Sequence, residues 1–230
     1  MLSKRLEQVA SMVTKGNIIA DIGTDHGYVP IYLVEKGICP KAYAMDINQG
    51  PIESAIKNIE NYGLSEKIQA IKSNGLEKLE PEKADTIIIA GMGGETILSI
   101  LKAAPWTADD HHTLLLQPQT HEELVRQYLA ENGFIITREA LVRDRGTLYT
   151  VMEARAGKAE LTLTQIWGGV CLLRDPLADR YIIEKIVRTQ AALAGAKRSA
   201  RPADAERAEA LRAVLTALLR AREEWRHANC

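Results

Sequence analysis

The sequence predicts an α/β fold with a seven-stranded sheet, followed by an antiparallel helical hairpin. Short apolar runs rich in β-branched residues alternate with helical patterns up to residue 131, which is typical of a parallel sheet covered on both faces. Two extended runs then follow each other across Arg145-Gly146 without a helix between them, as in a β-hairpin. From about residue 160 two amphipathic stripes replace the strands, which is typical of paired helices or a short coiled coil.

The elements are expected in the following order. Leu2, Leu6, Val9 and Val13 have helical spacing and predict an N-terminal helix. Parallel strands are expected at residues 17–23, 41–47, 67–73, 84–91 and 112–118. Helices are expected at residues 28–37, 51–62, 93–103 and 122–131, with glycines after several of their ends. The runs 134–144 and 147–155 supply the hairpin, so the sheet is Rossmann-like, with five parallel strands and an antiparallel pair.

The C-terminal part is expected to form a separate helical domain. Residues 161–176 form a transition segment, Gly195 is expected to end the first long helix, and Pro202 to begin the second. The first apolar stripe contains Leu177, Tyr181, Ile182, Ile186 and Leu193, and the second contains Leu211, Val214, Leu215, Leu218, Leu219 and Trp225. We therefore expect a sheet domain over residues 1–158 and a helical, coiled-coil domain over residues 159–230.

Composition excludes several classes of protein. The 230 residues carry a net charge of −1, which points to no particular partner, although residues 159–230 have 12 Lys and Arg against 9 Asp and Glu, a net of +3. Three distant cysteines without a CxxC pattern suggest a reducing compartment. No apolar run approaches the roughly 20 residues of a membrane span, and the N-terminus lacks a signal-peptide core. We expect a cytoplasmic protein without a membrane partner.

The segment IIADIGTDHGYVPIYL, residues 18–33, carries the strongest functional signal. It follows a predicted strand, and ligands of such sheets bind at the carboxyl ends of the strands. Gly23 and Gly27 allow a ligand to approach the backbone, but their spacing does not match the GxGxxG of dinucleotide sites. Asp21 and Asp25 would repel a pyrophosphate. They suit an ammonium or sulfonium group, and S-adenosylmethionine has both and no phosphate.

Later strand ends extend this cofactor prediction. Asp46 closes the second strand, where a carboxylate can accept hydrogen bonds from both ribose hydroxyls. Asn74, before Gly75, could bond the edge of the adenine, and Ile47 and Met92 could sandwich its ring. Asp followed by Gly is also an ordinary turn, but the ordered series on successive strand ends favours a cofactor site. The expected cofactor-binding residues are Asp21, Gly23, Asp25, Gly27, Asp46, Ile47, Asn74, Gly75, Gly91, Met92 and Gly93.

The motifs DIGTDHGYVP, AMD, SNGL, IIIAGMGG and LLLQPQ, in this order, resemble those of the bacterial tRNA (adenine-N1)-methyltransferases that modify adenine 22. The resemblance covers essentially the whole chain. It implies a class I methyltransferase domain that uses S-adenosylmethionine, and a C-terminal coiled-coil domain that contacts tRNA. One departure is Gln119, where the family more often has Asn. A monomer is favoured, although the apolar stripes could equally support a dimer.

Methylation at N1 of adenine requires geometry more than a base, because N1 has a free lone pair. The base must leave its pair to expose that edge, and it must be held in line with the methyl group. Candidate residues for this catalytic step are Asp25, His26 and Tyr28 in the first loop, and Gln117 at the fifth strand end. Each also has a structural explanation: cofactor contact for Asp25, a loop hydrogen bond for His26, packing for Tyr28 and a turn for Gln117.

Phosphate contacts are expected from the helical hairpin, because basic side chains dominate RNA affinity. The expected RNA-binding residues are Lys185, Arg188, Lys197, Arg198, Arg201 and Arg207. His111 and His112 have no third ligand nearby, so we expect surface residues and no metal. Two alternative functions are the methylation of a small molecule and RNA binding by a protein that retains an idle cofactor fold.

Overall fold

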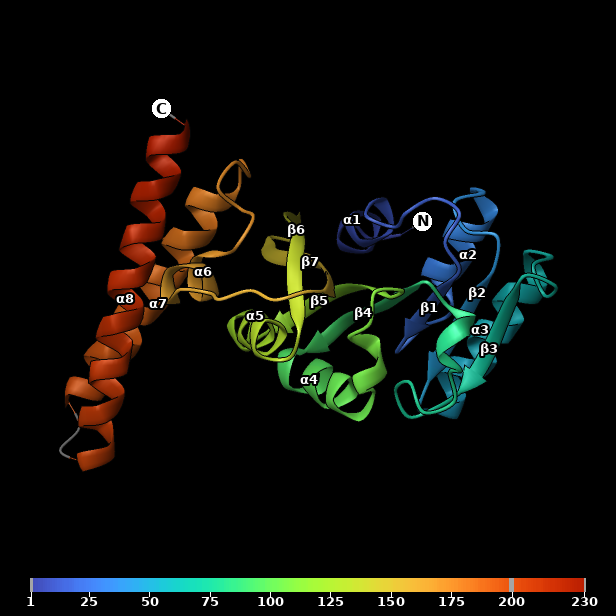
Figure 1. Cartoon of the computed structure of the whole chain (residues 1–230), viewed down its shortest axis with the longest axis horizontal. Coiled ribbons are helices and arrows are strands. Elements are labelled where there is room, and N and C mark those ends of the chain that lie inside the picture. The colour runs from blue at the N-terminus through green and yellow to red at the C-terminus, as the bar shows by residue number, and fades with distance from the viewer. Residues whose placement is uncertain (1, 199–200, 230) are drawn as a thin grey trace. The chain divides into compact units, whose positions relative to one another are not determined.

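The structure is a computed structural model that describes residues 2–198 and 201–229 (Figure 1). The chain forms two compact units. The first comprises residues up to 138 together with 142–159, and the second comprises residues 139–141 together with residues from 160 onward. No helix in the described ranges is both long and apolar enough to cross a membrane.

The sheet has seven strands in the order β3-β2-β1-β4-β5-β7-β6. The strands are β1 (Ile19–Ile22), β2 (Ala42–Asp46), β3 (Ile68–Lys72), β4 (Thr86–Gly93), β5 (Thr113–Thr120), β6 (Phe134–Asp144) and β7 (Thr147–Ala156). Strands β1 to β5 pair in parallel, and β7 pairs antiparallel with β5. This confirms the Rossmann-like prediction of five parallel strands and an antiparallel pair.

The helices of the first unit cover the sheet. They are α1 (Lys4–Ser11), α2 (Tyr28–Glu35), α3 (Gln49–Asn61), α4 (Gly94–Ala103) and α5 (Glu122–Glu131), with short 3₁₀ turns at Pro81–Lys83 and Pro105–Thr107. Helix α1 contacts α2, and α4 contacts α5; Figure 1 shows these two pairs on opposite sides of the strands. The central strands are therefore buried on both faces. Residues 87–89 and 114–116 are fully buried, which explains why their sequence is uninterruptedly apolar.

Two boundaries in this unit differ from the sequence prediction. Helix α3 begins at Gln49, two residues before the expected start at Pro51. Strand β5 continues past Pro118 to Thr120, although proline lacks the N–H that a ladder needs. The register between β4 and β5 shifts on both sides of Met92, so a bulge accommodates the proline.

The second unit contains α6 (Leu163–Gly168), α7 (Ala178–Arg198) and α8 (Pro202–Asn229). Helix α6 lies in the expected transition segment and is capped by Thr162 and Gln165, whose side chains bond each other's backbone N–H. Helices α7 and α8 pack against each other, and α8 begins at Pro202 as predicted.

Gly195 does not end the first long helix, contrary to expectation, because α7 continues to Arg198. Leu193, Ala196 and Ala208 form a buried cluster against which Leu211 and Leu215 pack. Packing on both sides of Gly195 offsets the roughly 1 kcal/mol by which glycine disfavours a helix interior.

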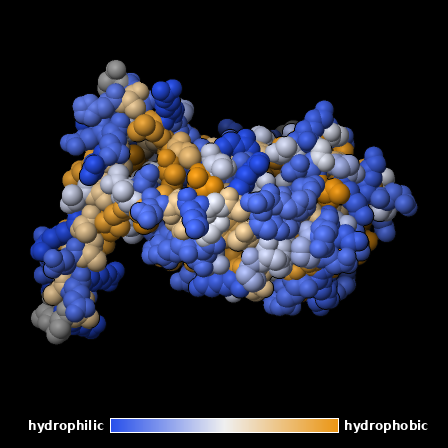
Figure 2. Space-filling model, in the orientation of Figure 1, coloured by the Kyte–Doolittle hydropathy of each residue, from blue (hydrophilic) through white to orange (hydrophobic). Residues whose placement is uncertain are grey.

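The predicted stripe of α8 is only partly buried. Val214 and Leu218 are buried, but Leu219 is 47% exposed, so its assignment to the apolar stripe was wrong. Trp225 donates from Nε1 to the Asp175 carbonyl at 3.2 Å. Figure 2 shows hydrophobic as well as hydrophilic surface on this unit, where Leu173 and other large apolar side chains are exposed.

Candidate active site at the carboxyl ends of the strands

Backbone pairing brings the loop after β1 and the ends of β2 and β3 to one edge of the sheet. Strand β2 pairs in parallel with both β1 and β3. The N–H of Gly23 donates to the Met45 carbonyl at 2.8 Å, and the N–H of Ser73 donates to the Asp46 carbonyl at 2.9 Å. The residues expected to bind a cofactor on these three strand ends therefore lie at the same edge.

Asp21 is the buried carboxylate of this edge. Its side chain lies at the end of β1, and the residue is only 6% exposed. Burial raises the pKa of Asp21 to about 6; the nearby Asp46 carboxylate adds to the rise, and the Thr24 hydroxyl acts in the opposite direction. A buried carboxylate with a raised pKa is stabilised in its charged form by a cation, so this position suits a positively charged ligand group.

The glycine loop and the end of β4 face each other beside Asp21. Gly23 has φ +75°, and a Cβ atom built there would lie 2.1 Å from the Met92 Cε. Met92 therefore lies over a backbone that only glycine can supply. Gly91, with φ +83°, and Gly93, which begins the turn into α4, flank this methionine. Gly27, also at positive φ, is the N-cap of α2.

The expected ribose and adenine contacts lie on the neighbouring strand ends. One oxygen of Asp46 accepts the Asn48 N–H at 2.7 Å, and Ile47 is 56% exposed at the mouth of the site. Asn74 donates to Glu77 at 2.6 Å. With Gly75 it lines a cavity of about 230 Å³ that continues toward α4 and Trp106.

A second cavity, of about 450 Å³, is lined by residues from early and late segments of the sheet unit's sequence. The first loop contributes Asp25 and Tyr28, and the β6–β7 hairpin contributes Arg145 and Tyr149. Its other lining residues are Leu2, Ser3, Arg5, Leu6, Gln119 and Asp144. The structure thus brings residues of the hairpin into one cavity with the first loop.

His26 and Tyr28 form an aromatic pair beside this cavity. Their ring centroids are 5.3 Å apart and nearly parallel, at 24°. His26 has φ +59°, which is uncommon for a residue other than glycine. The side-chain amide of Asn58 donates to the His26 carbonyl at 2.9 Å. A carboxylate oxygen of Asp25 lies 3.2 Å from His26 Nε2. Left-handed residues held by their surroundings cluster at functional sites, and Tyr28 itself is 49% exposed.

Gln117 is fully buried at the end of β5. Its Oε1 accepts the Gly91 N–H at 3.1 Å and also a guanidinium N–H of Arg5. Its Nε2 donates to the Pro118 carbonyl at 2.8 Å. This geometry favours a role in holding the end of β4 over direct contact with a base.

Arg5 is a residue of this site that sequence analysis missed. Besides bonding Gln117, its guanidinium lies over the Tyr149 ring, 5.7 Å from the centroid. Locally, nothing in the sequence distinguishes Arg5 from the adjacent Lys4, because the contact depends on a partner 112 residues away.

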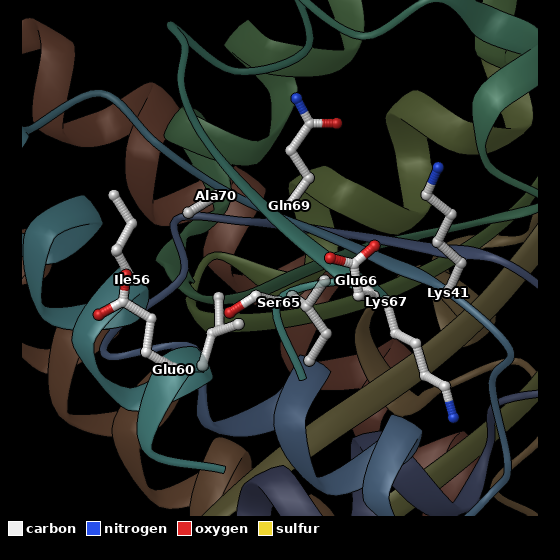
Figure 3. Close-up of a pocket in the computed structure, with 10 residues that line it drawn as sticks. Lys41, Ile56, Glu60, Ser65, Glu66, Lys67, Gln69 and Ala70 are labelled. Carbon is white, nitrogen blue, oxygen red and sulfur yellow. The ribbon is translucent and has the colours of Figure 1, made fainter. Parts of the chain in front are cut away.

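A third cavity lies away from these residues. It has a volume of about 350 Å³ and is lined by Lys41, Ile56, Glu60, Lys67, Gln69 and neighbouring residues (Figure 3). These residues surround the beginnings of β2 and β3, at the sheet edge opposite to the carboxyl ends. Nothing about its lining matches the predicted cofactor chemistry.

The histidine pair before β5 was predicted to be at the surface, which is wrong for His112. This side chain is 2% exposed, with Nδ1 2.6 Å from Asp109 and Nε2 2.9 Å from the Pro81 carbonyl. These two acceptors account for its burial. Within residues 2–198 and 201–229, no group of three or more His, Cys, Asp or Glu side chains could hold a metal ion.

The expected RNA-binding residues of the helical unit fall into two groups. The Lys185 ammonium lies 5.1 Å from the Tyr181 ring centroid and 5.3 Å from that of Trp167, so it is engaged in cation–π contacts within the unit. The remaining residues are exposed: Arg188, Lys197, Arg198, Arg201 and Arg207.

Comparison with known proteins identifies close relatives. Residues 2–152 match the protein family described as "Methyltransferase domain". The chain is 38% identical over 156 residues to a Bacillus subtilis protein named tRNA (adenine(22)-N(1))-methyltransferase, an alignment that spans 68% of this chain and 66% of the relative, just under two thirds of its length.

Solved structures of similar proteins match nearly the whole chain. The crystal structure of the B. subtilis m1A22 tRNA methyltransferase superposes with a TM-score of 0.89 at 28% identity, covering 96% of this chain and 99% of that one. Streptococcus pneumoniae Sp1610 in complex with S-adenosyl-L-methionine gives 0.85 at 34% identity, covering 96% and 100%. A Mycoplasma capricolum relative in complex with S-adenosyl-homocysteine gives 0.83 at 29% identity, covering 97% and 99%.

Proposed function

The chain belongs to the family of bacterial tRNA (adenine(22)-N1)-methyltransferases, and from that premise we propose that it transfers a methyl group from S-adenosylmethionine to N1 of adenine 22 in tRNA. The observation that carries the proposal is the position of buried Asp21, beside Asp46 and beneath the loop of Gly23. This edge of the sheet is suited to a cationic cofactor without phosphate.

The residues present fit this cofactor. Asp21 can pair with its amino group, and Asp46, at the end of the adjacent strand, can accept hydrogen bonds from the ribose hydroxyls. The absence of a Cβ at Gly23 lets the Met92 methyl group lie against the loop backbone, beside the position proposed for the cofactor. Exposed Ile47 supplies an apolar face for the adenine. When bound, the cofactor supplies an electrophilic methyl group whose transfer to the N1 lone pair requires no prior proton removal.

The target adenine would occupy the 450 Å³ cavity. Its two tyrosines, Tyr28 and Tyr149, provide aromatic faces, and stacking of a base on such a face is worth about 1–3 kcal/mol. N1 lies on the Watson–Crick edge, so the base enters unpaired or flipped. The ring becomes positively charged on methylation, and the carboxylates of Asp25 and Asp144 line the same cavity. Preorganised negative charge at that position stabilises the developing cation.

The helical domain, residues 159–230, would contact the body of the tRNA. Its exposed basic side chains include Lys197 and Arg198 at the end of α7 and Arg201 just before α8. Phosphate contacts of this kind make affinity fall steeply with salt. Lys185 is expected to contribute less to phosphate binding, because its ammonium makes cation–π contacts with Trp167 and Tyr181 of the same unit. The protein would act in the cytoplasm as a monomer.

The test is incubation of the full chain with methyl-labelled S-adenosylmethionine and unmodified tRNA transcripts. Nuclease digestion and mass spectrometry then map the modified position. We expect 1-methyladenosine at position 22 and no incorporation into a matched transcript with guanine 22. Label at another nucleotide would reassign the target, and label only on small molecules would favour the alternative function of small-molecule methylation.

A further inference from the structure

We propose that Arg5 is a positioning residue for methyl transfer. Its side chain contacts both the end of β4, beside the proposed cofactor site, and the cavity proposed for the base. This inference rests on the proposed function and adds a residue to it. Arg5 lies on α1, before the sheet begins, yet its guanidinium reaches the ends of β4 and β5 and the last strand, β7.

On the cofactor side, Arg5 and the Gly91 N–H share one acceptor, the Oε1 of Gln117. The guanidinium also lies against Gly91 directly, since a Cβ built there would be 3.3 Å from Arg5 Nη1. Gly91 precedes Met92, which lies over Gly23. Arg5 therefore helps to fix the backbone that faces the proposed methyl donor.

On the base side, the same guanidinium lies over the ring of Tyr149, and both residues line the 450 Å³ cavity. A cation over an aromatic face contributes about 0.5–1 kcal/mol at exposed sites and more when desolvated. The contact fixes the orientation of the tyrosine that we expect to stack on adenine. The Arg5 side chain thus contacts both Gln117, beside the proposed methyl donor, and Tyr149, beside the proposed position of the adenine.

Helix α1 is itself firmly held, which makes a positional role possible. Val9 and Ala10 are almost fully buried. At the other end of the helix, the Met12 carbonyl accepts a hydrogen bond from Nη2 of Arg138 at 2.6 Å. Arg138 is paired in turn with Glu153, a carboxylate that is only 4% exposed. These contacts hold the helix that carries Arg5, and they do not involve residues of the proposed site.

The chemistry of this position suits arginine and not lysine. A guanidinium is planar, donates hydrogen bonds along its edge and stacks through its face. Arg5 donates through Nη1 to Gln117 and holds its guanidinium carbon 5.7 Å from the centroid of the Tyr149 ring. An ammonium is a single compact donor, so Arg5→Lys keeps the charge but cannot reproduce both contacts with one planar group.

The direct test compares Arg5→Ala and Arg5→Lys with a matched control, Glu7→Gln. Glu7 is exposed on the same helix, and its replacement also removes one charge. Misplacement of reacting groups by 1 Å can reduce rates about 100-fold. At saturating cofactor and tRNA, we expect the single-turnover rate to fall about 100-fold for Arg5→Ala and at least 10-fold for Arg5→Lys. Calorimetric affinity for S-adenosylmethionine should change less than about threefold, and Glu7→Gln should match the wild type.

Chemical rescue separates positioning from general damage. Added methylguanidinium should restore a measurable part of the rate of Arg5→Ala, whereas it should not help Gln117→Leu, which lacks the acceptor. Gln117→Glu, which keeps an acceptor for Arg5, should retain more activity than Gln117→Leu. The double variant Arg5→Ala with Gln117→Leu should be little slower than either single variant, because coupled residues are not additive.

Two results would overturn the inference. One is an unchanged saturating rate in Arg5→Ala together with weaker tRNA binding and a salt slope reduced by about one, which would make Arg5 a phosphate contact. The other is a normal rate and normal tRNA affinity. If the wild type itself transfers no methyl group to tRNA, the proposed function fails instead, and the two failures are therefore distinguishable.

Discussion

Replacing Asp21 by Asn should stabilise the sheet unit while abolishing cofactor binding. Burial raises the pKa of Asp21 from 3.8 to about 6. Because the folded state holds this proton more tightly than the unfolded state, the free energy of unfolding falls as pH rises between about 4 and 6. Above pH 6 the full penalty of a buried, ionised carboxylate is present. Asn has nearly the same shape and never ionises.

The magnitude follows from the shift in pKa. Each pH unit corresponds to about 1.36 kcal/mol, so ionised Asp21 costs the folded state about 3 kcal/mol at pH 7.5. Asp21→Asn should regain up to that amount, less whatever its amide N–H groups lose without an acceptor. For a chain of this size, each kcal/mol raises Tm by roughly 2–4 °C. At pH 4 the wild type and the variant should unfold at nearly the same temperature.

Differential scanning calorimetry at pH 4 and pH 7.5, with and without S-adenosylmethionine, measures both effects. The cofactor should raise the Tm of the wild type, because a ligand that binds only the folded state stabilises it. It should leave the Asp21→Asn variant unchanged, and isothermal titration should detect no binding. A variant that binds the cofactor normally, or whose Tm at pH 7.5 is no higher than that of the wild type, would refute the assignment of Asp21 as a buried carboxylate that binds a cation.

Four further outcomes are expected. Affinity of the wild type for S-adenosylmethionine should rise roughly tenfold between pH 5 and pH 7 and then level off, because the carboxylate of Asp21 must ionise through a pKa of about 6; a flat titration profile would contradict this. Asp46→Ala should eliminate calorimetric binding of the cofactor while circular dichroism remains unchanged. Asp25→Asn should slow single-turnover transfer more than it weakens tRNA binding in a filter assay, and a normal rate would end its catalytic candidacy. A chain ending at residue 159 should still bind the cofactor but not methylate tRNA, and full activity would remove the RNA role of the helical unit.

The central strands could be predicted from the sequence, because a strand that is buried on both faces has an uninterrupted run of apolar residues. The run over residues 86–89 and the run over residues 113–116 are almost completely buried in the sheet, and their nearly continuous apolar sequence marks them as central strands. Turn residues marked the hairpin equally well, since both Arg145 and Gly146 have positive φ. The residues expected to bind a cofactor lie at one sheet edge because parallel strands present their carboxyl ends together.

Long-range contacts account for most of the differences. Helix α7 continues past Gly195 because Leu193 and Ala196, on either side of it in the sequence, pack against α8, and a local helix-ending rule does not take that distant partner into account. His112 is buried by Asp109 and Pro81 from a preceding turn. Arg5 acquires its neighbours from β5 and β7, which sequence spacing cannot reveal. In contrast, the cap of α6 depends on a local pattern, because Thr162 and Gln165 have the spacing of a capping box.

The reach of Arg5 also affects how the protein is made. During synthesis α1 leaves the ribosome first, but its arginine meets Gln117 only after another 112 residues have followed, and Tyr149 later still. Contacts between such distant segments form late and slow the folding of a domain. A nascent chain released before β7 therefore lacks Tyr149 and the contact that Arg5 makes with it, so premature termination should yield an inactive product even when the parallel strands are complete.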